Sequence, residues 1–213
     1  MRNRGEVANG TLPAVSKDAP GVRYAEVERE SGDTAFRVVV DLDGERQATV
    51  QTGVAYFDHM LEQLAFHGKL DLGVSVEGVG LDDHSTVEEV GTCLGQVIRQ
   101  AIGEGDGIDS YGAAYAPIDE ALVRVVVDVS GKPHVVFDVE FTNERIGEMA
   151  TESVEQFFRA LANNAWITIH VHRIAGKNNH HLCEAIFRAL GRSLRDAVHK
   201  SDTNAKGGKG RID

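Results

Sequence analysis

The sequence lacks most of the features that mark secreted and membrane proteins. It contains only two cysteines, Cys93 and Cys183, too few for a disulfide framework. No stretch approaches 18 consecutive apolar residues, so we expect no membrane span. The first ten residues, MRNRGEVANG, carry no apolar signal-peptide core. These absences predict a cytoplasmic chain with two free thiols that pack as small hydrophobic side chains.

Basic residues are also scarce relative to acidic ones. The 22 Lys and Arg residues face 33 Asp and Glu residues, which gives a net charge of -11. Non-specific nucleic-acid binding needs clustered Lys and Arg, so we expect no nucleic-acid partner. The acidic net charge does not exclude a local basic pocket that binds a phosphate. The sequence also has no G-x-x-x-x-G-K-[ST] and no G-x-G-x-x-G that opens a helix after a strand. Nucleotide binding therefore has little support.

What the chain does contain is an order of strands and helices that occurs twice. Alternating apolar residues predict strands, and apolar residues spaced by three and four predict helices. The first half has strands at 22–30, 34–44, 46–52 and 70–78, and helices at 56–69 and 84–102; the second has strands at 111–118, 121–129, 134–141 and 167–176, and helices at 151–165 and 180–198. Thr151 is the expected N-cap of its helix.

This order predicts an α+β fold of two homologous βα halves, with the helices on one face of each sheet. We expect a disordered arm at residues 1–20 and one domain at 21–213. The domain comprises two repeats, 21–107 and 108–200, and a flexible Gly/Lys-rich tail.

The last helix of each half carries direct evidence of a duplication. The segment HSTVEEVGTCLGQVIRQAI begins at His84, and HHLCEAIFRALGRSLRDAV begins 96 residues later at His180. The two align without a gap and share six identities in nineteen positions. Two of these identities are His84 with His180, and Glu88 with Glu184. The repeated His-x-x-x-Glu pattern favours a functional pair over a chance spacing.

Residues four apart share one face of a helix, so each His-x-x-x-Glu pair can close on one metal ion. His181 is rotated about 100° from His180 and should serve a different centre. His59, on the helix of residues 56–69, is a third candidate, and its neighbour Asp58 suits a cap or an outer partner. A His and Glu donor set without paired thiolates favours Mn²⁺, Fe²⁺ or Zn²⁺. His170 and His172 share a strand face, where solvent exposure, packing and ligation all remain open.

With these motifs assembled, the chain closely resembles the imidazoleglycerol-phosphate dehydratase family, which catalyses a dehydration in histidine biosynthesis. The resemblance covers roughly residue 22 to the C-terminus. It is carried by FDHMLEQLAFHG, LDDHSTVEEVG, PIDEALVRVVVDVSGKP, VEQFFRALANNA, TIHV and HHLCEAIFRALGRSLRDA. The resemblance implies two halves of the ribosomal-protein-S5-domain-2-like kind. It also implies a large octahedral homo-oligomer of trimers, with di-manganese sites between subunits.

The resemblance further implies roles for particular residues. The implied metal ligands are His59, His84, Glu88, His180, His181 and Glu184, and the two glutamates would also move protons. The implied contacts to a small phosphorylated imidazole substrate are Asp33, Lys132, Arg188 and Lys206. The implied cofactor is Mn²⁺, with Fe²⁺ or Zn²⁺ as alternatives, and no organic cofactor is expected.

Asp33, Lys132 and Arg188 stand where the family usually has Glu, Arg and Lys and keep the charge, whereas four other positions depart from the family's pattern in kind. Ser85 and Gln156 stand where the family has His, Ser110 where it has a phosphate-binding Arg, and Asn204 where it has Ser. By the internal duplication, Gln156 is the counterpart of His59 and Ser85 that of His181. We therefore expect one complete site and one degraded site. The complete site would be His59, His84, Glu88 and His181, and the degraded one Gln156, His180, Glu184 and Ser85.

The resulting hypothesis is a metal-dependent hydro-lyase that converts imidazole glycerol phosphate to imidazole acetol phosphate. The alternative is a divergent paralogue that keeps the fold and one metal site but lacks the dehydratase reaction, with a binding or structural role. A third reading is an unrelated enzyme, such as a hydrolase, that uses the remaining metal site.

Overall fold

The structure is a computed structural model that describes residues 22–78 and 82–201. The predicted arm at 1–20 and the tail positions Lys206 and Asn204 lie outside these residues. The first half contains β1 (Tyr24–Ser31), β2 (Thr34–Asp41), β3 (Ala48–Gln51), α1 (Ala55–Gly68), β4 (Asp71–Glu77) and α2 (Asp83–Ile102). The second half contains β5 (Tyr111–Ile118), β6 (Ala121–Asp128), β7 (His134–Asp138), β8 (Arg145–Ile146), β9 (Met149–Ala150), α3 (Glu152–Ala165), β10 (Thr168–Ala175) and α4 (Asn179–Ala197).

Each half forms a four-stranded sheet with the same topology. The strand orders are β1-β2-β4-β3 and β5-β6-β10-β7. In both sheets the first three strands pair antiparallel, and the fourth pairs parallel to the third. The identical order confirms the α+β fold of two homologous βα halves.

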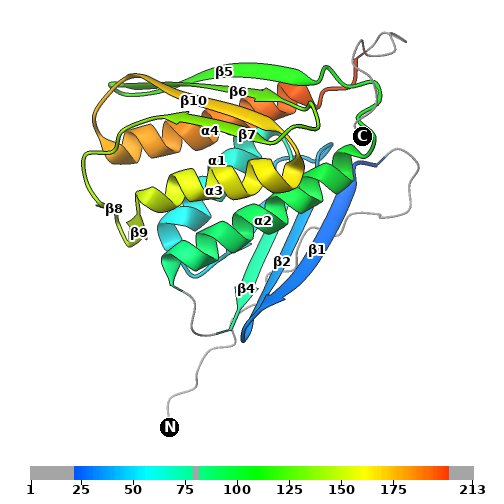
Figure 1. The fold of residues 1–213 in the computed structure, drawn as a ribbon, viewed down its shortest axis with the longest axis horizontal. Helices are drawn as coiled ribbons and strands as arrows, with labels where there is room; N and C mark the ends of the chain where they lie inside the picture. Colours follow the sequence, from blue (N-terminus) through cyan, green and yellow to red (C-terminus); the bar gives the residue numbers. More distant parts are fainter. Residues whose placement is uncertain (1–21, 79–81, 202–213) are drawn as a thin grey trace.

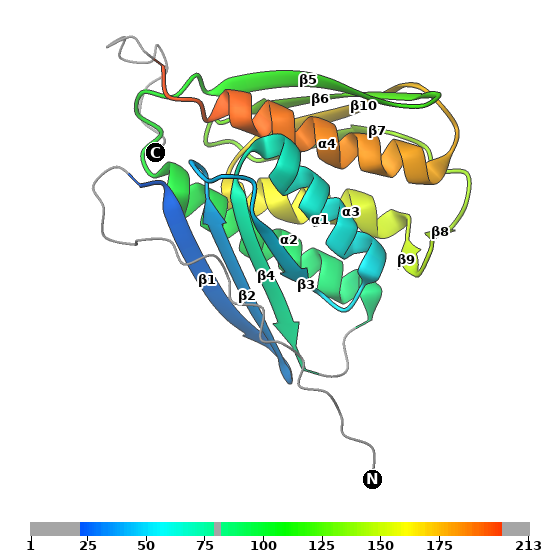
Figure 2. The same ribbon diagram turned by 180° about the vertical axis from the view of Figure 1, so that it is seen from behind.

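The two sheets lie on the outside, and the four helices lie between them (Figures 1 and 2). Helices α1 and α2 cover the inner face of the first sheet, while α3 and α4 cover that of the second. Across the middle, α1 packs on α4 and α2 packs on α3. Each helix pair therefore combines one helix from each half, which decides which candidate site residues can meet.

The middle of the helical layers is filled by aromatic side chains. Phe57 of α1 and Phe157 of α3 have ring centroids 5.4 Å apart in an edge-to-face arrangement. The ring of Phe187, on α4, stacks on that of Phe157 with centroids 5.2 Å apart. All three side chains are fully buried. Such pairs add about 0.5–1.5 kcal/mol beyond their buried area, so this cluster holds the two halves together.

Several local expectations hold, and others need correction. Cys93 and Cys183 are free and buried, as expected. Thr151 precedes α3, but its hydroxyl donates to the carbonyls of Asn143 and Glu144 and caps no helical N–H. Strand β7 ends at Asp138, three residues earlier than expected. The short hairpin β8–β9 was not expected, because two-residue strands leave no periodic signal.

Within the described residues, no helix has the length and apolar character needed to cross a lipid bilayer.

Candidate metal centre

The first turn of α4 presents His180 and Glu184 on one face. The side chain of Asn178 caps this helix by accepting from the backbone N–H groups of His180, at 2.9 Å, and His181, at 3.4 Å. One turn further on, Glu184 Oε2 lies 3.4 Å from His180 Nε2. The Tyr56 ring and the imidazole of His180 pack edge-to-face, with centroids 5.1 Å apart. The expected His-x-x-x-Glu pair is therefore formed and supported.

His59 completes a cluster with this pair. Its Nε2 lies 3.7 Å from Glu184 Oε2, because α1 packs on α4. Asp58 beside it accepts from the backbone N–H of Thr52 at 2.9 Å, so it fastens the loop that enters α1. We call His59, His180 and Glu184 the α1/α4 cluster.

Glu184 is buried at 7% exposure, and both of its oxygens are engaged. Oε2 faces the two imidazoles, while Oε1 accepts from the guanidinium of Arg188, one turn further along α4. Arg188 is itself fixed, because its Nε donates to Gln63 Oε1 at 3.1 Å. A buried carboxylate needs such partners, since removing an unpaired charge from water is costly. Arg188 therefore holds Glu184 with Oε2 directed at the histidines.

His181 points away from this cluster, as its rotation on the helix predicts. Its Nδ1 lies 2.8 Å from Glu120 Oε2, and its Nε2 lies 3.8 Å from Asp119 Oδ2. The hydrogen bond with Glu120 raises the pKa of His181 and lowers that of Glu120 to about 2. Sequence reasoning missed Glu120, because a residue on the β5–β6 turn has no positional link to α4.

The first-half motif lies on α2. The Asp82 side chain caps this helix by accepting from the backbone N–H of Ser85 at 2.8 Å. His84 is partly buried and Glu88 is exposed. Within one chain His59 meets Glu184, so the predicted site of His59, His84, Glu88 and His181, whose ligands would come from different subunits, stays a prediction. The contact of His59 with Glu184 follows from packing: α1 contacts α4, and it is α3, with Gln156, that packs on α2.

The expected substrate residues do not gather around the α1/α4 cluster within one chain. Arg188 does lie there, but bound to Glu184. Asp33 is exposed on the β1–β2 turn. The Lys132 carbonyl accepts from Thr168 Oγ1 at 2.9 Å, at the start of β10. Because β10 has eight residues and spans about 25 Å, Lys132 lies far from α4's first turn. Lys206 lies outside the described residues.

Metal chemistry fits the donors of the α1/α4 cluster. Two ligands about 2.1 Å from one ion lie roughly 3.0–3.4 Å apart at angles of 90–109°. The His180–Glu184 separation of 3.4 Å falls in this range, and the His59–Glu184 separation of 3.7 Å slightly exceeds it. In the part of the chain that the structure describes, no three His, Cys, Asp or Glu side chains are yet close enough to hold an ion. Small side-chain movements or further donors must complete the set.

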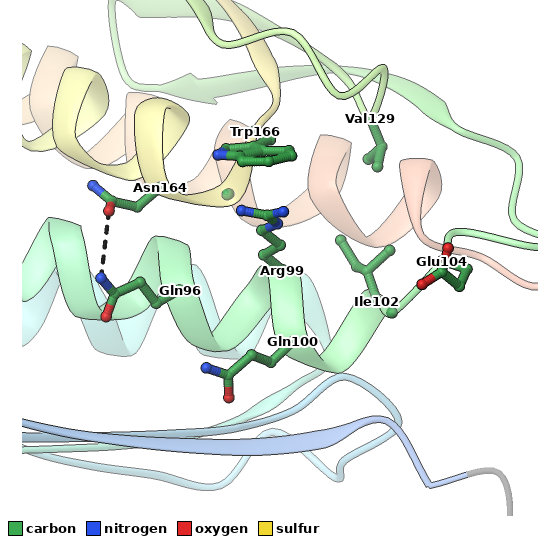
Figure 3. Close-up of a pocket in the computed structure, with 10 residues that line it drawn as sticks. Gln96, Arg99, Gln100, Ile102, Glu104, Val129, Asn164 and Trp166 are labelled. Carbon is green, nitrogen blue, oxygen red and sulfur yellow. Dashed lines mark hydrogen bonds between the residues drawn. The ribbon is translucent and has the colours of Figure 1, made fainter. Parts of the chain in front are cut away.

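A cavity of about 400 Å³ lies elsewhere, at the C-terminal ends of α2 and α3 (Figure 3). The guanidinium of Arg99 stacks on the Trp166 ring, 3.0 Å from its centroid. Gln96 Nε2 donates to Asn164 Oδ1 at 3.5 Å on the same wall. The Arg99–Trp166 and Gln96–Asn164 contacts therefore join the C-terminal ends of α2 and α3 beside this cavity.

Comparisons with known proteins point to one family. A family model described as imidazoleglycerol-phosphate dehydratase matches residues 52–194. The imidazoleglycerol-phosphate dehydratase of Acetivibrio thermocellus is 49% identical over 181 residues, which cover 84% of this chain and 93% of that protein. The one from Halorhodospira halophila is 50% identical over 186 residues, which cover 87% and 94%.

Solved structures give the same answer. The crystal structure of imidazoleglycerol-phosphate dehydratase from Staphylococcus aureus matches with a TM-score of 0.76 and 36% identity, covering 84% of this chain and 99% of that one. The enzyme from Pyrococcus furiosus matches with a TM-score of 0.71 and 28% identity, covering 84% and 95%. The fold, the α1/α4 cluster and these matches lead to one conclusion: the chain belongs to the imidazoleglycerol-phosphate dehydratase family.

Proposed function

We propose that this chain is a hydro-lyase that dehydrates imidazole glycerol phosphate to imidazole acetol phosphate in histidine biosynthesis. Family membership supports this reaction. The observation that carries it at the level of residues is the α1/α4 cluster, in which His59, His180 and Glu184 meet from the two halves. The cluster's donors suit Mn²⁺, with Fe²⁺ or Zn²⁺ as alternatives. The proposal includes no organic cofactor and places the enzyme in the cytoplasm.

The reaction removes water from two neighbouring carbons. One carbon loses its hydroxyl, the next loses a proton, and the resulting enol becomes a ketone. A bound metal ion would supply Lewis acidity toward the substrate's imidazole. Glu184 is buried, and Arg188 directs its carboxylate at the two histidines. Its role would therefore be to hold the metal ion in place. Glu88 is exposed and so is the better placed of the two carboxylates to move a proton.

The phosphate would bind at the other end of the second half. Lys132 follows β6 there, and Ser110 lies beside it, since the Ser110 carbonyl accepts from the Val129 N–H at 2.7 Å. This end is separated from the α1/α4 cluster of the same chain by the length of β10, about 25 Å. A small substrate cannot bridge that distance. The proposal therefore includes a symmetric homo-oligomer, built of trimers, in which one copy supplies the phosphate contact to another's metal centre.

The experiment is a dehydratase assay on the full chain after dialysis, with and without added Mn²⁺. We expect metal-dependent formation of the ketone product, at a rate that His180→Ala reduces at least about a hundredfold. The matched control is His199→Ala, because His199 is an exposed histidine paired with Asp109 at 3.1 Å. A folded, metal-loaded protein without turnover contradicts the proposal and supports the alternative of a paralogue that has lost the reaction.

A further inference from the structure

The helix pairs α1/α4 and α2/α3 are duplicates of one another in three dimensions. In α4, a Cβ added to Gly191 would lie 2.4 Å from the carbonyl oxygen of Leu64. In α2, a Cβ added to Gly95 would lie 2.6 Å from the carbonyl oxygen of Leu161. Gly95 and Gly191 are 96 residues apart, and Leu64 and Leu161 are 97 apart. The same close approach therefore fixes the register of both pairs.

This register carries each residue of the α1/α4 cluster onto a residue of the other pair. His180 and Glu184 map onto His84 and Glu88, but His59 maps onto Gln156. An amide is a neutral and weaker donor to a divalent transition metal than an imidazole. Within one chain, the α2/α3 pair thus offers one strong nitrogen donor where the α1/α4 cluster offers two.

The supports around the carboxylate are not duplicated either. Arg188 and Gln63, which hold Glu184, map onto Thr92 and Ala160. Neither is long enough to reach a carboxylate one helical turn away. Glu184 is buried, whereas its counterpart Glu88 is exposed. Binding an ion would therefore cost Glu88 side-chain entropy, whereas Glu184 already lost this entropy when the chain folded.

The partner of the histidine differs as well. Tyr56, whose ring packs edge-to-face with that of His180, maps onto Ser153. Ser153 is fully buried, and its hydroxyl has no hydrogen-bond partner in the described residues. Outer partners of this kind typically change metal affinity by about 10–100-fold. The differences in the metal donors and the differences in the residues that support them thus both favour tighter metal binding at the α1/α4 cluster.

We propose that the two metal centres of this chain are unequal: one divalent transition metal binds tightly at the α1/α4 cluster, and a second binds at least about tenfold more weakly at the α2/α3 pair. The inference rests on the proposed function, in which this chain binds a divalent metal ion. It follows from the asymmetry between His59 and Gln156, reinforced by Arg188, Gln63 and Tyr56.

A reciprocal exchange tests this inequality. The full chain is loaded with Mn²⁺ and dialysed, its metal content is measured by elemental analysis, and free Mn²⁺ is followed by electron paramagnetic resonance during titration. We expect about one retained ion per chain in the unaltered protein. Gln156→His should raise the count toward two, and His59→Gln should lower it toward zero. Glu155→Gln, next to Gln156 on α3 and paired with the exposed Arg159, is the matched control.

The outcomes separate cleanly. Two retained ions in the unaltered protein, or none, overturn the inequality, as does a Gln156→His protein whose second ion binds no more tightly. Because Gln156→His is a gain of binding, unfolding cannot imitate its expected result. Turnover is measured separately. A chain with one tight ion and no dehydratase activity contradicts the proposed function and supports this inference; an active chain with two equal ions does the reverse.

Discussion

Glu184 Oε2 lies 3.7 Å from His59 Nε2, although the two residues belong to different halves of the chain. The contact exists because α1 of the first half packs on α4 of the second. The other oxygen of Glu184 is held by Arg188. One buried carboxylate thus joins the two halves, two imidazoles and a guanidinium, so the metal centre depends on the same packing that holds the fold together.

The first prediction concerns Arg188. Arg188→Gln should weaken Mn²⁺ binding at the α1/α4 cluster by about 10–100-fold, because the Glu184 carboxylate loses the partner that orients it. Titration calorimetry on the dialysed protein measures this. Arg192→Gln is the control, since Arg192 lies one turn further along the same helix and is exposed. Equal affinities in the two variants would show that Arg188 does not position the carboxylate.

The second prediction concerns the close approach of α4 to α1. Gly191→Ala should lower the free energy of unfolding by about 1–3 kcal/mol, because the added Cβ would meet the Leu64 carbonyl oxygen at 2.4 Å and force the helices apart. Intrinsic helix propensity alone predicts the opposite sign. Urea unfolding followed by circular dichroism decides between them. A stabilised Gly191→Ala protein would mean that the helices separate at little cost.

A third prediction concerns acid stability. Arg23 donates two hydrogen bonds to Asp43, at 3.0 and 2.6 Å, and these lower the pKa of Asp43. A depressed carboxyl pKa stabilises the fold above the unfolded pKa of about 3.9, and this stability is lost as pH falls below it. Because the Asp43 side chain is 43% exposed, the contribution is under about 1 kcal/mol.

Asp43→Asn measures this contribution directly. The unaltered protein should be more stable than Asp43→Asn at pH 6, and the difference should be smaller at about pH 2.5. Urea unfolding at the two pH values provides both differences. If the difference in the free energy of unfolding is the same at both pH values, it arises from packing or from the amide and not from the ion pair.

The fold was predictable because its signals are local. Helices α2 and α4 carry apolar residues at helical spacing, and the strands of both halves alternate. The aligned pairs His84 with His180 and Glu88 with Glu184 already indicated a duplication, and the identical sheet orders bear it out. Helices α4 and α2 begin at Asn179 and Asp83, each one residue before the expected start, an ordinary uncertainty at helix ends.

The grouping of the site residues was not predictable in the same way. Whether His59 meets Glu184 or Glu88 depends on which helix of the other half α1 touches, and no local pattern encodes that contact. The same holds for Gln63 and Glu120, which reach Arg188 and His181 from distant elements. A duplication reveals which residues are equivalent, but only packing between the halves reveals which are neighbours.

The fourth prediction concerns assembly. If the phosphate contact and the metal centre of one site come from different copies, the chain must form a symmetric oligomer. Where a neighbouring copy supplies a further donor to the ion, chelation should reduce the oligomer's size or its Tm, because an ion held across copies stabilises the assembled state. Size-exclusion chromatography with light scattering, before and after chelation, measures this. A stable monomer under both conditions would contradict the shared site.

The last prediction concerns the phosphate. Ser110 lies beside the β6–β7 turn that carries Lys132, and it has a left-handed backbone with φ of 66°. Arginine in its place adds a second cation at no extra backbone strain, since serine already bears that conformation. A charge-assisted hydrogen bond contributes about 1.5–3 kcal/mol, so Ser110→Arg should tighten substrate binding by roughly tenfold or more.

Ser110→Gln is the matched control, because it adds a side chain of polar character without the charge. KM and inhibition by inorganic phosphate, measured at fixed ionic strength, report the effect. The improvement should appear in Ser110→Arg alone and should fade as salt rises, because screening weakens the added attraction at an exposed site. An unchanged KM in Ser110→Arg would mean that the phosphate does not reach this end of the second sheet, and Lys132 would lose its proposed role with it.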